Sequence, residues 1–231
     1  KNYVVTGDIG CYTLGFAPPL NCMDVCICMG GGFSAGMGMA KSFQREGVTD
    51  KVVFGVMGDS TFFHSGMTGA AEIIYNNGRM IPCVLDNRIT GMTGHQDNPG
   101  TGYTLQGDPT ALLSVEKILT ALGFAPVLTV DPQDLKAMKA AVDQAVAALD
   151  AGQQPAIVTR RPCLLIKRDK FRKGMCRVNA DKCRSCRSCL KVGCPAISLE
   201  NGKAVIDRTQ CVGCTVCAQV CPFDAIEKEE K

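Results

Sequence analysis

The chain has 231 residues, of which 46% are hydrophobic and 20% charged, and its formal net charge is +3. This length allows one full α/β domain and a smaller second domain. It contains no run of eighteen apolar residues, so the composition excludes a membrane span and favours a soluble globular protein. We expect no nucleic acid among its partners.

The first two thirds of the chain alternate between short apolar segments and segments with helical periodicity. After a strand-like beginning and a glycine-rich stretch, we expect, in chain order, a helix over 32–46, a strand over 51–57, a helix over 66–77, a strand over 80–86, a helix over 109–122, a strand over 127–130, a helix over 134–149 and a strand over 156–159. Between them, 87–108 forms a glycine- and proline-rich loop that is too long for a simple connector.

This alternation predicts an α/β domain, a parallel sheet with helices on both faces, over residues 1–168. The basic stretch 160–173 is the expected linker to a second, small α+β domain over 169–231. That second domain has 12 Lys and Arg against 8 Asp and Glu. The basic excess either offsets negative charge within this domain, attracts an acidic partner protein, or is only a solvated surface.

Two strand ends in the α/β domain carry oxygen ligands. Gly58-Asp59-Ser60 ends one strand, and Asn87 ends another 28 residues after Asp59. Ligands of open α/β sheets bind beyond the carboxyl ends of the strands, where these side chains can converge. Mg2+ prefers oxygen ligands and is often shared with substrate phosphates. Each dipeptide alone reads as a turn, but the pair predicts a diphosphate–metal site with a nearby backbone carbonyl as a third ligand.

Eight of the fifteen cysteines lie in the last forty-nine residues, in two C-x2-C-x2-C runs that each end in Cys-Pro. This pattern is typical of a bacterial-type 2[4Fe-4S] ferredoxin domain, in which the fourth ligand of each cluster comes from the other run. The predicted first set is Cys183, Cys186, Cys189 and Cys221, and the predicted second set is Cys211, Cys214, Cys217 and Cys194.

Other interpretations of these cysteines fit less well. Zinc sites usually use two C-x2-C pairs, and disulfides need a secreted protein, for which no signal segment is present. The first run has four residues before Cys194 where three are usual, which leaves the geometry there unsettled. Seven further cysteines favour a reducing interior, a cytoplasmic location and an anaerobic host. Among them Cys22, Cys26 and Cys28 match no common metal spacing.

Longer motifs carry a family resemblance. GDIGCYTLG over 7–15, CMGGGFSAGMGMAK over 28–41, GDSTFFHSG over 58–66 and LDNRITGMTGHQ over 85–96 resemble the thiamine-binding part of the large subunit of indolepyruvate ferredoxin oxidoreductases. The 58–87 pairing is similar to the thiamine diphosphate motif, with Ser60 where that motif has glycine. The domain order, with a double-cluster ferredoxin domain last, is also similar.

The resemblance implies a thiamine diphosphate site with Mg2+ bound by Asp59, Asn87 and the backbone oxygen of Ile89. It further implies contacts to the diphosphate or the cofactor rings from Gly10, Cys11, Met29, Gly30, Gly58 and Ser60, and a covering loop that includes Thr90, Gly91 and Met92. His64 and Met92 are the candidate catalytic residues, although His64 also reads as a packed or capping residue and His95 as an exposed one.

The implied reaction is the oxidative decarboxylation of an aryl 2-oxo acid with coenzyme A, giving arylacetyl-CoA and CO2, with electrons passing through two [4Fe-4S] clusters to ferredoxin. Pyruvate, a branched-chain oxo acid and 2-oxoglutarate remain alternative substrates, and a pure electron-transfer subunit or a non-redox thiamine decarboxylase remain alternative functions. The resemblance also implies another polypeptide, or a longer one, that supplies a pyrimidine-binding domain with a catalytic glutamate. A start at Lys1, within a strand-like segment, suits a fragment or a split gene.

Overall fold

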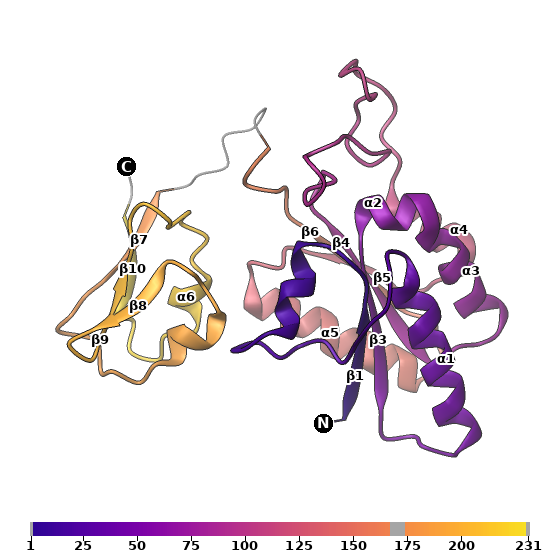
Figure 1. Cartoon of the computed structure of the whole chain (residues 1–231). Coiled ribbons are helices and arrows are strands. Elements are labelled where there is room, and N and C mark those ends of the chain that lie inside the picture. Colours follow the sequence, from indigo (N-terminus) through magenta and orange to yellow (C-terminus); the bar gives the residue numbers. More distant parts are fainter. Residues whose placement is uncertain (1, 167–173, 230–231) are drawn as a thin grey trace.

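A computed structural model of the chain describes residues 2–166 and 174–229, and its larger part is built on a six-stranded sheet (Figure 1). Every adjacent pair of strands is parallel. Across the sheet the strands are, in order, β2 (Val25–Cys26), β1 (Tyr3–Gly7), β3 (Val52–Gly58), β4 (Met80–Asp86), β6 (Ala156–Arg160) and β5 (Val127–Val130). The predicted parallel sheet is therefore confirmed.

Helices cover both faces of this sheet, as predicted. On one face lie α1 (Gly31–Arg45), α3 (Met67–Tyr75) and α4 (Val115–Leu122), and on the other lies α5 (Leu135–Asp150). Alternate side chains of β3 pack into the cores on opposite faces of the sheet. Val53 and Met57 pack with α1 and α3, whereas Phe54 and Val56 pack with α5. A strand buried on both faces reads as a continuous apolar run, which is the pattern of β3 and β4.

Helix α1 lies unusually close to the sheet at its first turn. Gly30, at φ +85°, ends the preceding turn in a left-handed conformation, and the helix begins at Gly31. A Cβ atom on Gly32 would lie 2.6 Å from the carbonyl oxygen of Val56 in β3. The run of glycines thus permits a backbone-to-backbone approach, which brings the α1 N-terminus next to the carboxyl ends of the strands.

Two helices differ from the sequence prediction at their starts. Helix α4 begins at Val115 instead of 109, because the Ser114 side chain caps it by accepting a hydrogen bond from Lys117 N–H. The residues before it belong to the loop, where Leu113 N–H donates to Pro99 O. The helix expected from residue 66 begins instead at Asp59, as α2 (Asp59–Thr61), a π-helical turn η2 (Phe62–Gly66) and then α3.

The six-residue 3-10 helix η1 (Cys11–Phe16) was not expected from the sequence. Toward the end of the α/β domain, Arg160 belongs to β6 rather than to a linker, and the predicted domain boundary between 168 and 169 lies outside the described residues. Within 2–166 and 174–229, no helix combines the length and apolarity needed to cross a membrane.

The smaller domain is built from two antiparallel strand pairs and two short helices around a sulfur-rich core (Figure 1). Strand β7 (Met175–Val178) pairs with β10 (Ile226–Glu229), and β8 (Ile197–Glu200) pairs with β9 (Lys203–Ile206). The 3-10 helix η3 (Ser188–Val192) and helix α6 (Val216–Gln219) lie within the two cysteine runs and contain the third cysteine of each, Cys189 and Cys217. Its α+β content agrees with the predicted ferredoxin class.

The close approach of α1 to β3 predicts a specific loss of stability. Substituting Gly32→Ala should lower the free energy of unfolding by roughly 1–3 kcal/mol, because the new methyl group meets backbone that cannot rotate away. The same change at Gly38, an exposed position of α1 with open space around it, should raise stability by about 0.5–1 kcal/mol. Urea unfolding of both variants measures this, and equal effects would contradict the packing argument.

Candidate functional site

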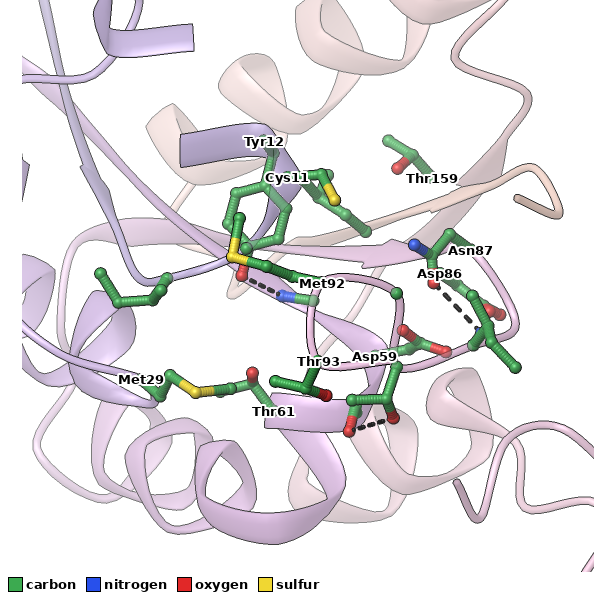
Figure 2. Close-up of a pocket in the computed structure, with 18 of the residues that line it drawn as sticks. Cys11, Tyr12, Met29, Asp59, Thr61, Asp86, Asn87, Met92, Thr93 and Thr159 are labelled. Carbon is green, nitrogen blue, oxygen red and sulfur yellow. Dashed lines mark hydrogen bonds between the residues drawn. The ribbon is translucent and has the colours of Figure 1, made fainter. Parts of the chain in front are cut away.

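A cavity of about 350 Å³ opens beyond the carboxyl ends of β1, β3, β4 and β6. Figure 2 shows Asp59 and Asn87 in this cavity, which also contains Tyr12 and Met29. Most of the predicted site residues line it: Gly10, Cys11, Met29, Gly58, Asp59, Ser60, Asn87, Ile89, Thr90, Gly91 and Met92. The structure therefore brings together segments that are as much as eighty residues apart in sequence.

Asp59 is the buried carboxylate of this cavity, with only 2% of its surface exposed. It follows β3 directly and accepts one side-chain hydrogen bond, from Asn98 Nδ2 at 3.1 Å. Burial raises the pKa of Asp59 to about 6, and the hydrogen bond from Asn98 opposes that rise. Among the described residues, Asp59 forms no ion pair with Lys, Arg or His, so the cost of burying its charge has no cationic compensation there.

The segment after β4 folds into a tight turn that faces Asp59. Asp86 Oδ1 accepts from Arg88 N–H at 3.2 Å, and Asn87 Oδ1 accepts from Ile89 N–H at 3.1 Å. Asp and Asn favour such turns because their side chains bond the backbone two residues on. Arg88 is left-handed here, at φ +61°. The turn places Asn87 and Ile89 at the cavity wall.

The neighbouring loop is tied to the β3 end. Thr90 Oγ1 donates to Ser60 Oγ at 2.8 Å, and Thr90 also pairs with Gln96 through its backbone. Ser60 therefore has a role that glycine could not take, because its hydroxyl fixes the loop that follows Asn87. Gly91 lies against Asn87 and Cys11, so the loop covers one side of the cavity.

A second buried carboxylate, Asp8, organises the opposite wall. It accepts hydrogen bonds from the Tyr12 hydroxyl and, at 3.0 Å, from Gly30 N–H. The Tyr12 hydroxyl in turn accepts from Gly58 N–H at 2.8 Å. Burial, followed by the Asp8 hydrogen bond, raises the pKa of Tyr12 far above its usual range, so Tyr12 stays protonated. This network joins the ends of β1 and β3 to the turn before α1.

Sequence reasoning missed several of these residues. Asp8 and Tyr12 lie in the quoted 7–15 motif but were not singled out, and Asn98 was hidden in the long loop. Arg161 also lines the cavity, although the sequence placed it in a linker. The length of the 87–108 loop was the only signal for Asn98, since its contact with Asp59 spans 39 residues.

Some predicted residues lie elsewhere. Gly30 and His64 are not among the residues that line the cavity, and His64 is exposed on η2. His64 is nevertheless near enough for its charge to lower the pKa of Asp8, against the larger effect of burial that raises it. Cys22 donates to the backbone of Gly15, whereas Cys26 donates to that of Asp8, so these thiols have separate partners.

The first predicted set of cluster cysteines surrounds one cavity of the smaller domain. Cys183, Cys186, Cys189 and Cys221 all line it. Hydrogen bonds from the backbones of Ala204 and Ser185 lower the pKa of Cys183. Ala225 N–H also donates to Cys221 Sγ at 3.4 Å. Backbone donors of this kind stabilise thiolates, and they tune the potential of a cluster bound to them.

Three cysteines of the second set, Cys194, Cys211 and Cys217, pack in the same sulfur-rich core. Burial raises the pKa of Cys217 to about 12, and nearby Cys176, Cys214 and Cys194 add to the rise. Cys194 therefore lies near the second run despite the extra residue before it. Gly193, at φ +70°, ends η3 in a left-handed turn that accommodates this residue. Cys176 N–H donates to Cys211 Sγ at 3.2 Å, a contact that sequence did not predict.

The donor chemistry of the two sites suits different groups. The described residues contain no trio of His, Cys, Asp or Glu side chains that could bind one metal ion. The large cavity instead offers the Asp59 carboxylate, which has no cationic side-chain partner among the described residues, together with Asn87 and Ile89. Oxygen ligands of this kind fit a hard cation shared with a phosphate-bearing ligand. The small domain offers only thiols around a cavity, which fits an iron–sulfur cluster.

Comparison with known proteins agrees with this division. The family model for the C-terminal TPP-binding domain of thiamine pyrophosphate enzymes matches residues 8–159. The chain belongs to this thiamine pyrophosphate enzyme family. A model for a 4Fe-4S binding domain matches residues 204–227. The thiamine diphosphate-binding domain therefore carries a 4Fe-4S binding domain behind it in the same chain, as the sequence predicted.

The chain is also similar to named relatives. It is 40% identical, over 97% of its length, to indolepyruvate oxidoreductase subunit IorA of Pyrococcus abyssi, of which it covers 37%. It is 36% identical to the subunit of that name from Methanothermobacter marburgensis, covering 36% of it. The chain thus spans little more than a third of the length of these relatives.

One solved structure shares the fold of the large domain. The 2-oxoglutarate:ferredoxin oxidoreductase from Magnetococcus marinus superposes with a TM-score of 0.55 at 17% identity, over 70% of this chain and 55% of that one. At such identity the similarity supports the fold alone.

The Asp8–Tyr12–Gly58 network predicts that Tyr12→Phe weakens cofactor binding. The change leaves the Gly58 N–H and the Asp8 carboxylate each short of one partner, at a cost of about 1–3 kcal/mol. Calorimetric titration with thiamine diphosphate and Mg2+ should show affinity reduced about tenfold. Tyr75→Phe, at an exposed position on α3, is the matched control and should bind as the parent does. Equal affinities for all three proteins would contradict the proposed network.

The buried Asp59 predicts a pH dependence of cation binding. Its pKa is raised to about 6, so the carboxylate becomes protonated, and unable to bind a cation, as the pH falls through that value. Affinity for Mg2+ with thiamine diphosphate should therefore fall about tenfold per pH unit below this point. Asp59→Asn should bind weakly with no such slope. A flat affinity for the parent protein down to about pH 5 would contradict the assignment.

Proposed function

We propose that this chain supplies the thiamine diphosphate site and the electron-transfer clusters of a 2-oxo acid:ferredoxin oxidoreductase. The observation that carries the proposal is the buried Asp59 carboxylate, which has no Lys, Arg or His partner among the described residues. It lies within a thiamine-family cavity, in the same chain as two sets of clustered thiols. A non-redox decarboxylase has no use for those thiols. A pure electron-transfer subunit has no use for the cavity.

In this proposal Mg2+ is bound by Asp59, Asn87 and the backbone oxygen of Ile89, and the assignment is supported by the presence of these three residues in the cavity lining. Gly58 and Ser60 approach the diphosphate, while Gly10, Cys11 and Met29 lie toward the rings of the cofactor, and Gly30, outside the cavity lining, forms the turn that positions Met29. Thr90, Gly91 and Met92 cover the reacting side. The Ser60–Thr90 hydrogen bond supports this arrangement, because it fixes the covering loop against the β3 end.

When bound, thiamine diphosphate supplies the carbon nucleophile that makes the decarboxylation of a 2-oxo acid feasible. The residues of this chain bind and orient it and exclude water. Ile9, Met29, Leu85, Ile89 and Met92 give the cavity an apolar wall, and such a wall suits an aryl side chain. His64 and Met92 remain the proposed catalytic residues; Met92 lines the cavity, whereas His64 lies outside its lining but near enough to Asp8 for its charge to lower the pKa of that carboxyl.

The proposed substrate is an aryl 2-oxo acid such as indolepyruvate, with coenzyme A as acyl acceptor. The names of the relatives at 40% and 36% identity support this choice over pyruvate, branched-chain oxo acids or 2-oxoglutarate. The electrons pass to ferredoxin through two [4Fe-4S] clusters. Cys183, Cys186, Cys189 and Cys221 bind one cluster, and Cys194, Cys211, Cys214 and Cys217 bind the other. A reducing cytoplasm is the proposed location, since it preserves such clusters.

A further polypeptide, or a longer form of this one, completes the proposed active site. No glutamate lines the described cavity, and the chain covers only 37% of its relative from Pyrococcus abyssi. Exposed apolar side chains lie near the cavity on η1 and in the segment before α1: Leu14 is 69% exposed and Ile27 68%. Such a surface suits a partner domain that brings the pyrimidine-binding glutamate.

A substrate panel tests the proposed activity. In the complete enzyme, indolepyruvate with coenzyme A should reduce methyl viologen or ferredoxin faster than pyruvate, a branched-chain oxo acid or 2-oxoglutarate does. A higher kcat/KM for one of these three oxo acids than for indolepyruvate would change the proposed substrate but keep the proposed reaction class. No dye reduction with any oxo acid, in an enzyme whose clusters are intact by iron content, would reject the oxidoreductase proposal.

Substituting Asp59→Ala should abolish Mg2+-dependent binding of thiamine diphosphate and the oxo-acid activity with it. Loss of a charged metal ligand should lower kcat/KM by at least about a hundredfold. The cluster content should not change, because the ligands of the clusters belong to the other domain. Asp108→Ala, at an exposed position of the long loop, is the matched control. Thiamine-dependent activity that survives in Asp59→Ala would reject the metal assignment.

A further inference from the structure

Among the described residues, the two domains are in contact through Gln219. Gln219, on the last turn of α6, donates from Nε2 to Gln133 O at 2.8 Å and accepts from Leu135 N–H at 3.0 Å. Both partners belong to the segment between β5 and α5. Gly193, next to Cys194, also lies beside Leu20 of the large domain. In Figure 1, α6 is accordingly on the side of the smaller domain that faces the sheet domain.

This contact lies beside the second set of cysteines. A hollow of about 330 Å³ between the domains is lined by Cys214, Thr215 and Gln219 from one side and by Asp131, Gln133, Asp134 and Arg161 from the other. Arg161 is paired with Asp131, Nη1 to Oδ2 at 2.7 Å. The first set lies apart from this contact, in a cavity lined by the smaller domain alone.

The large-domain side of this hollow also forms part of the wall of the cofactor cavity. Arg161 lines both hollows, and Pro132, between Asp131 and Gln133, lines the cofactor cavity. A single layer of chain, formed by residues 131–133 and Arg161, therefore separates the proposed thiamine diphosphate site from Cys214. No such shared wall connects the cofactor cavity to the first set within the described residues.

We infer that electrons enter the smaller domain at the cluster bound by Cys194, Cys211, Cys214 and Cys217, and leave it from the cluster bound by Cys183, Cys186, Cys189 and Cys221. This order rests on the proposed function. Each 2-oxo acid oxidised with coenzyme A yields one acyl-CoA, one CO2, one proton and two electrons. The electrons pass singly through the two clusters to two ferredoxins, which are the oxidant.

The surface around the first set suits an exit. Cys186 is exposed, and exposed Arg184, Arg187 and Lys191 surround it in sequence. Their positive charge would attract an acidic carrier and speed its association. The entry side differs, because Cys214 lines a hollow whose other wall belongs to the large domain. In this order, Gln219 is a positioning residue, since it holds the entry cluster against the wall of the cofactor cavity.

The variant Gln219→Ala tests the docking in the complete enzyme with its partner chain. Loss of its two hydrogen bonds should slow cluster bleaching by indolepyruvate and coenzyme A about tenfold. Hydrogen exchange at the Leu135 amide should become faster, and reduction by dithionite should not change. Gln153→Ala, the same substitution at an exposed position after α5, should behave as the parent does. An unchanged bleaching rate together with faster Leu135 exchange would overturn the inference.

The variants Cys214→Ser and Cys186→Ser, at equivalent positions of the two runs, test the order itself. In Cys186→Ser, the substrate should still reduce the second-set cluster, detected by its electron paramagnetic resonance signal, while transfer to ferredoxin is lost. In Cys214→Ser, the substrate should fail to reduce the first-set cluster that dithionite still reduces. The opposite pattern would reverse the order. If the parent enzyme is not reduced by any 2-oxo acid, the proposed function has failed instead.

Discussion

The site depends on a difference between two buried carboxylates at strand ends: arginines neutralise one of them, and among the described residues no cationic side chain neutralises the other. Asp86, at the end of β4, is paired with Arg160 at 2.8 Å and with Arg88 at 3.4 Å, so its burial is compensated within the protein. Asp59, at the end of neighbouring β3, has only the Asn98 amide as a side-chain partner among the described residues. A buried carboxylate without a cation is costly and shifts its pKa upward. The fold thus leaves one of the two carboxylates in need of a cation, and the Asx turns after β4 bring oxygen atoms to the same place.

Much of the fold and part of the site could be predicted from the sequence, because short-range sequence patterns determine them. The buried strands and most helices follow from apolar periodicity, and the Asp59–Asn87 pair follows from its position at two strand ends. Asn98, Tyr12 and Arg161 could not be found in that way, since their roles depend on contacts across the fold. The start of the helix directly after β3 could not be predicted either. The turn at 62–66 is π-helical, and it buries the two consecutive residues Phe62 and Phe63, so this segment does not show the 3.6-residue apolar period of a regular helix.

The two cysteine runs share a backbone conformation although the spacing before their last cysteines differs. Arg187 and Thr215, which follow equivalent cysteines, have φ of 62° and 63°, so both runs take the same left-handed turn. The additional residue before Cys194 falls at the end of η3, where Gly193 adopts φ +70° at little cost. A glycine at this point explains why the longer gap does not carry Cys194 away from Cys217.

Covalent connection explains why so small a contact between the domains suffices. Two hydrogen bonds from Gln219 and the packing around Gly193 would bind a free ferredoxin weakly. A short tether raises the effective concentration of the second domain to roughly the millimolar range, so that a weak contact is occupied most of the time. Weak docking has a further consequence, because the contact need not bury the exit cluster. One face of the domain can remain against the cofactor cavity while the face with Arg184 and Arg187 stays free for an external carrier.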